Sequence, residues 1–115
     1  MKYYGSLYPS HKPVDFSNYQ AALSSSLSKA GHMDALRAML DAKKAPAEAR
    51  IPDVHARTLV VMGSKDPDFE DPRAEAMLVG RLLHGEVHLV DGAGHYPHAE
   101  FPDQTSAIIT TFLTE

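Results

Sequence analysis

A histidine in a tightly constrained loop is the residue of this sequence best suited to chemistry. His95 follows Gly92-Ala93-Gly94 and is followed by two prolines, Pro97 and Pro102. The glycines allow backbone angles that other residues avoid, and the prolines remove donors and stiffen the chain. Because an imidazole titrates near neutral pH, such a loop is suited to aiming a general base. The alternative is that the loop is an ordinary turn with His95 on its surface.

A carboxylate occupies a similar position earlier in the chain. Asp66 follows the apolar run Thr58–Gly63, which does not alternate in polarity and therefore predicts a strand covered on both faces. Asp68, two residues further along the same loop, is the alternative acid. A carboxylate and a histidine in neighbouring loops form the orienting half of a catalytic triad, in which the acid holds one ring nitrogen and the other accepts a proton.

The elements between these residues determine whether they meet. Asp71 and Pro72 are placed to begin a helix that closes at Gly85, and residues 87–90 form the next apolar run. This order predicts a βαβ unit with parallel strands, followed by a helix over residues 108–113. Ligands collect at the carboxyl ends of parallel strands. The two loops that carry the acid and the histidine should therefore open at the same edge of the sheet.

The first half of the chain is predicted to be helical. Apolar residues recur at spacings of three and four over residues 16–30 and again over 33–40, which indicates two amphipathic helices. Asp15 is placed as an N-cap and Gly31 as the end of the first helix. Their apolar stripes are packing faces or, alternatively, the wall of a pocket for an apolar substrate. We expect residues 1–14 to be irregular and residues 45–55 to be a linker.

Composition narrows the classes of partner. A chain of 115 residues fits one small domain, and its net charge of −4 without a basic run argues against nucleic acid and anionic membranes. No apolar window approaches the roughly 20 residues of a membrane span. The absence of cysteine excludes disulfides and thiolate chemistry and fits a reducing compartment. We therefore expect a cytoplasmic protein.

Residues 51–113 resemble the C-terminal end of an α/β-hydrolase. The matching residues are Leu59-Val60-Val61-Met62-Gly63 with Ser64-Lys65-Asp66, and Gly92-Ala93-Gly94-His95 with Pro97-His98 and Glu100-Phe101-Pro102. The resemblance implies an α/β fold in which residues 51–115 are the C-terminal βαβα portion of a parallel sheet. It implies Asp66 as the triad acid and His95 as the base. Residues 1–50 are similar to the helical cap segment and linker that precede this region.

The sequence departs from the family at the nucleophile. The Gly-x-Ser-x-Gly turn that carries it is absent from this chain, and neither Ser6 nor Ser64 has a glycine on both sides. We therefore expect a fragment of a hydrolase of ester or similar acyl bonds that is inactive alone. Its small-molecule substrate would bind in the complete enzyme. Family members with an aspartate nucleophile cleave carbon–halogen bonds, so the nucleophile type stays open.

Two other functions remain as alternatives. One alternative is a non-catalytic interaction or remnant domain that self-associates or needs a complementary chain, because two parallel strands make a poor independent sheet. A metal site built on His95 and His98, three residues apart, lacks an evident third ligand. We therefore expect no metal and no cofactor.

Overall fold

The C-terminal half of the chain is a βαβ unit with parallel strands. The computed structural model describes residues 2–115. Strand β1 (Leu59–Gly63) is followed by helix α5 (Pro72–Leu83) and strand β2 (Glu86–Val90). The strands pair in parallel, with Leu59 opposite Glu86 and Gly63 opposite Val90. The α/β class predicted from the sequence is therefore confirmed as a mixed fold with a two-stranded parallel sheet.

Local sequence explains the start of α5. The Asp71 side chain accepts a hydrogen bond from the Ala74 backbone N–H at 2.9 Å, and Pro72 occupies the first helical position. An N-cap of this kind satisfies a donor that the first helical turn leaves unpaired. The helix ends one residue earlier than predicted, because His84 adopts the left-handed conformation at φ 50° before Gly85.

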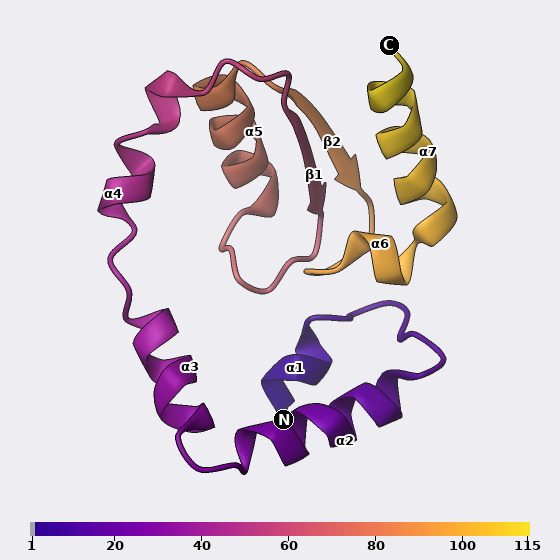
Figure 1. The fold of residues 1–115 in the computed structure, drawn as a ribbon. Coiled ribbons are helices and arrows are strands. Elements are labelled where there is room, and N and C mark those ends of the chain that lie inside the picture. Colours follow the sequence, from indigo (N-terminus) through magenta and orange to yellow (C-terminus); the bar gives the residue numbers. More distant parts are fainter. Residues whose placement is uncertain (1) are drawn as a thin grey trace.

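Two further helices follow the sheet. The short helix α6 (Pro97–Glu100) leads into α7 (Pro102–Thr114), which begins six residues before the predicted start at Ile108. Helices α5 and α7 both contact the two strands, and Figure 1 shows them flanking the strand pair. They cover it incompletely. Residues 59–62 of β1 are only half-buried, so the predicted full coverage of this apolar strand is wrong for the described residues.

The first half of the chain forms a curved succession of helices (Figure 1). Helices α2 (Phe16–Leu27) and α3 (His32–Leu40) confirm the two predicted helices. The predicted end of the first helix at Gly31 was wrong, because α2 ends at Leu27 and Gly31 precedes α3 as its N-cap, and Asp15 makes no side-chain cap hydrogen bond. The expectation that residues 1–14, called the lead-in below, are irregular was wrong for the helix α1 (Lys2–Ser6). The segment expected to be a linker, residues 45–55, contains the short helix α4 (Ala45–Glu48) and a 3-10 turn (Ile51–Asp53).

The molecule is open for its size. Its accessible surface is 8237 Å², whereas a compact protein of this mass exposes about 6,200 Å². Its radius of gyration is 16.2 Å, against about 13 Å for a compact chain of the same length. The buried apolar residues are few and come from the lead-in, α5, the end of β2 and the loop after it: Leu7, Tyr8, Ala76, Val90 and Ala93.

The core therefore lies where the lead-in meets the carboxyl edge of the sheet, beside His95. Within residues 2–115, no helix combines the length and apolar character that crossing a membrane requires. The predicted boundary at residue 50 stays a prediction.

Candidate active site

The loop after β2 is held from two sides. The His95 backbone N–H donates to the carbonyl oxygen of Leu7 at 3.0 Å, and the Lys65 N–H donates to the carbonyl of Ala93 at 2.8 Å. A side chain at Gly94 would collide with Leu7 and Pro9, so the lead-in can lie against the loop only because this position is glycine. The backbone that carries the imidazole is thus fixed by both the lead-in and the loop after β1.

Asp66 and His95 form a hydrogen-bonded pair at the carboxyl ends of the two strands. Nδ1 of His95 lies 2.9 Å from Oδ2 and 3.2 Å from Oδ1 of Asp66. The Asp66 side chain is only 4% exposed, whereas that of His95 is 37% exposed. Because an ionised carboxylate can only accept hydrogen bonds, Nδ1 must carry the proton in this contact. In the neutral ring, Nε2 then holds a free lone pair.

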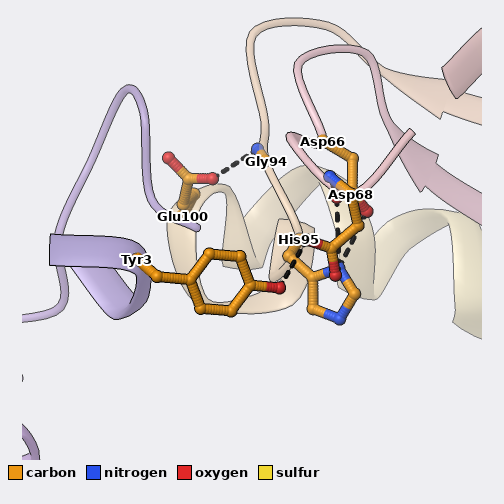
Figure 2. A network of polar contacts seen from close by, with 6 residues as sticks. All are labelled: Tyr3, Asp66, Asp68, Gly94, His95 and Glu100. Carbon is orange, nitrogen blue, oxygen red and sulfur yellow. Dashed lines mark hydrogen bonds and ion pairs between the residues drawn. The ribbon is translucent and has the colours of Figure 1, made fainter. Parts of the chain in front are cut away.

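The orientation of the ring is visible in Figure 2. Nδ1 points toward the carboxylates, and Nε2 lies on the opposite side of the ring. Among the described residues, Nε2 has no hydrogen-bond partner, while the His95 side chain lines an adjacent cavity. A base in this state can accept a proton from a group that enters the cavity.

Asp68 reaches the same nitrogen from farther away. Its Oδ2 lies 3.4 Å from Nδ1 of His95, and its side chain is 30% exposed. Its backbone N–H donates to Oδ1 of Asp66 at 3.0 Å, which helps to hold the buried carboxylate in place. Of the two acids weighed from the sequence, Asp66 is the closer and the more buried. Asp68 makes a longer contact with the same nitrogen and supports Asp66 through its backbone N–H.

Tyr3 binds Asp68 from the far end of the sequence. Its hydroxyl donates to Oδ1 of Asp68 at 2.5 Å (Figure 2). This hydrogen bond, with smaller contributions from burial and from the neighbouring carboxylates, raises the pKa of Tyr3 to about 12. The phenol therefore remains a donor throughout the neutral range. Nothing in the local pattern around Tyr3 indicated this role.

Glu100 holds the lead-in against the loop that carries His95 (residues 91–96, the histidine loop). Its side chain is buried and accepts the backbone N–H of Gly94 at 2.5 Å and those of Ser10 and His11 at 2.9 Å each. The sequence places Glu100 five residues after His95, and the bond to Gly94 shows that its carboxylate helps to shape the loop. It did not predict that the same carboxylate would bind the lead-in, because those partners lie 90 and 89 residues away.

The serines considered as nucleophiles have structural partners. Ser64 Oγ donates to Oδ1 of Asp91 and accepts the N–H of Gly92, both at 2.9 Å. Ser6 Oγ donates to the carbonyl of Tyr3 at 2.7 Å. Neither hydroxyl forms a hydrogen bond with His95 in the part of the chain that the structure describes. The pair of Asp66 and His95 thus has no serine partner among these two.

In the structure, the residues that could together bind a metal differ from the pair considered in the sequence. Asp66, Asp68 and His95 each offer a ligand atom, and these atoms lie within 4.8 Å of one another. His98 is not part of this group; its ring instead contacts Tyr96, with centroids 6.0 Å apart. The pairing of His95 with His98 that the metal alternative required therefore has no support in the geometry.

A cavity of about 520 Å³ opens beside His95. Apart from three tyrosines and His95 itself, its lining is aliphatic or thioether, and it draws on α1, α2, α3 and the histidine loop: Tyr3, Tyr4, Leu7, Leu23, Leu27, Leu36, Met39, Leu40, His95 and Tyr96. The alternative interpretation of the two apolar stripes, as a pocket wall, matches this lining.

No protein-family model, no curated protein and no solved structure matches this chain. The chemistry of the site must therefore be inferred from its own geometry.

Proposed function

We propose that this chain is the acid- and base-bearing C-terminal part of an α/β-hydrolase-type enzyme that cleaves ester or similar acyl bonds. The observation that supports it most directly is the 2.9 Å contact between Nδ1 of His95 and Oδ2 of Asp66 at the ends of adjacent parallel strands. In this proposal, residues 1–50 act as the cap. The nucleophile comes from a polypeptide segment outside these 115 residues.

The geometry supports a defined sequence of proton transfers. His95 Nε2 accepts the proton of the nucleophile's hydroxyl as its oxygen bonds to the acyl carbon. Asp66 stabilises the resulting imidazolium through Nδ1–H. The imidazolium then donates its proton to the leaving oxygen as the acyl–oxygen bond breaks. In the second half, His95 deprotonates water, which attacks the acyl intermediate and releases the acid, and the proton returns to the nucleophile.

The decisive experiment supplies the missing nucleophile. The chain is produced together with the polypeptide encoded immediately upstream, and hydrolysis of p-nitrophenyl acetate is measured. We expect His95→Ala to lower kcat by about 10³-fold or more, the scale of triad removal. The matched control is His88→Ala, since His88 is exposed on β2. Turnover that survives His95→Ala unchanged would refute the assignment.

A second candidate is a non-catalytic domain that persists by pairing. It is favoured by the open shape: the chain exposes 8237 Å², about 2,000 Å² more than a compact protein of its mass. A standard interface buries about 1,600 Å² in total. Analytical ultracentrifugation across a concentration series tests it. A stable monomer at all concentrations would remove this candidate, whereas association without ester turnover in the reconstituted mixture would favour it.

A further inference from the structure

The cavity beside His95 has the properties of a binding site for a hydrocarbon chain. At about 520 Å³, it falls within the range of about 300–1,000 Å³ that small-molecule sites occupy. Its lining combines leucines and a methionine from α2 and α3 with His95 and three tyrosines. A ligand with an apolar tail and a reactive head would match both kinds of side chain.

The charges near His95 disfavour a ligand whose head group is a carboxylate. Two carboxylates, Asp66 and Asp68, lie within 3.4 Å of His95 Nδ1. Among the described residues that line the cavity, none is a lysine or arginine. The Tyr3 hydroxyl already donates to Asp68, so it is not free for a ligand anion. An anionic head would lose its hydration here without gaining a cation, and this cost disfavours it.

We propose that this cavity binds neutral esters with a medium-length alkyl acyl chain, with the ester group at His95 and the chain between α2 and α3. This assignment deepens the proposed hydrolase function and rests on it for the chemistry, but binding requires only this chain. The apolar stripes Leu23–Leu27 and Leu36–Leu40 then form the acyl pocket. Within this lining, Met39 is 64% and Leu40 is 63% exposed in the free chain, and a ligand in the cavity would cover both side chains.

The test measures binding without catalysis. The purified chain is titrated with methyl acetate, methyl butanoate, methyl hexanoate, methyl octanoate and the octanoate anion, below their aggregation concentrations. Methionine methyl and His95 ring resonances are followed by NMR. We expect affinity to rise about fourfold for each buried methylene. Octanoate should bind about tenfold or more weakly than methyl octanoate.

Matched variants locate the site. Met39→Asp places a charge in the cavity wall and should weaken methyl octanoate binding by about tenfold or more. Met77→Asp introduces the same change on α5, outside the cavity lining, at a methionine that is 54% exposed, and should leave binding unchanged. Leu40→Gln provides a second cavity variant should circular dichroism show that Met39→Asp is unfolded.

Each outcome bears on one assignment. A chain-length dependence that Met39→Asp or Leu40→Gln abolishes supports the proposed ligand class. Equal binding by both cavity variants and wild type, or tighter binding of octanoate than of its ester, overturns it. Ester binding by a chain whose reconstituted form never hydrolyses esters leaves this site standing and removes the hydrolase function. Ester hydrolysis by the reconstituted enzyme without a preference for acyl-chain length leaves the hydrolase function standing and removes this site.

Discussion

The hydroxyl of Tyr3 and the carboxylate of Asp68 meet at 2.5 Å although they lie 65 residues apart in sequence. This bond joins α1 to the loop that carries the proposed acid. Together with the bonds that Glu100 makes to Ser10 and His11, it makes the lead-in part of the site. The imidazole of His95 is therefore positioned by three separate stretches of chain.

The Tyr3–Asp68 bond should give stability a dependence on alkaline pH. The pKa of Tyr3 is raised from its ordinary value of 10.0 to about 12. A raised pKa means that the folded state holds the proton more tightly, so this contribution is present below pH 10 and is lost as pH rises toward 12. We expect Tyr3→Phe to reduce the fall in the free energy of unfolding over this window, measured by urea denaturation.

The control for this prediction is Tyr19→Phe, which removes the hydroxyl of an equally exposed tyrosine: Tyr3 is 62% and Tyr19 61% exposed. Part of the alkaline fall should remain in Tyr3→Phe, because burial also raises the pKa values of Tyr8 and Tyr96. An identical pH dependence in wild type and Tyr3→Phe would contradict the predicted contribution of this bond.

The two aspartates near His95 should differ in their effect on its tautomer. In Asp66→Asn, the amide can donate as well as accept, so the preference for the Nδ1–H tautomer should be lost. In Asp68→Asn it should persist, because the Asp66 contact at 2.9 Å remains. Nitrogen-15 NMR of the imidazole in the free chain measures this difference directly.

The same pair of variants predicts an ordering of activity in the reconstituted enzyme. Asp66→Asn should lower kcat by about 10³- to 10⁴-fold, the scale of losing the triad acid. Asp68→Asn should have a much smaller effect, since its Oδ2 lies 3.4 Å from Nδ1 and its side chain is partly exposed. A larger loss in Asp68→Asn would assign the acid to Asp68 instead.

Removing the Glu100 carboxylate should destabilise the fold. Its side chain is buried and accepts three backbone N–H groups, so Glu100→Ala leaves three donors without their acceptor. We expect a loss of about 3 kcal/mol in the free energy of unfolding, on the scale of hydrogen bonds to charged groups. The matched change Glu70→Ala, at an exposed position, should cost less than about 0.5 kcal/mol.

Two glycines should respond to alanine in opposite ways. A methyl group at Gly94 would collide with Leu7 and Pro9, so Gly94→Ala should displace the lead-in and cost about 1–3 kcal/mol. Gly5 lies in α1, and a methyl group there meets nothing within 4 Å. Gly5→Ala should therefore be neutral or stabilise by up to about 1 kcal/mol. Thermal and urea unfolding measure both; equal effects would argue against the close approach at Gly94.

The pattern of the chain was sufficient to predict elements whose signals are local. The strand that ends at Gly63, the helix that begins at Pro72 and the amphipathic stripes of α2 and α3 all appear in the structure. A cap, a proline or a periodic stripe acts within a few residues, so it can be recognised in a single sequence. The parallel order of the strands followed from the same information, because a helical crossover requires it.

Tertiary structure alone decided how the site is completed. Asp66 and His95 could be expected at one sheet edge, but the participation of Tyr3 and the anchoring of Ser10 and His11 by Glu100 could not. Those contacts join residues 65 to 90 positions apart. They depend on the path of the whole lead-in, which local propensity does not specify. The tight loop around His95 was visible in the sequence, whereas the surroundings that orient its ring arise only when distant segments fold together.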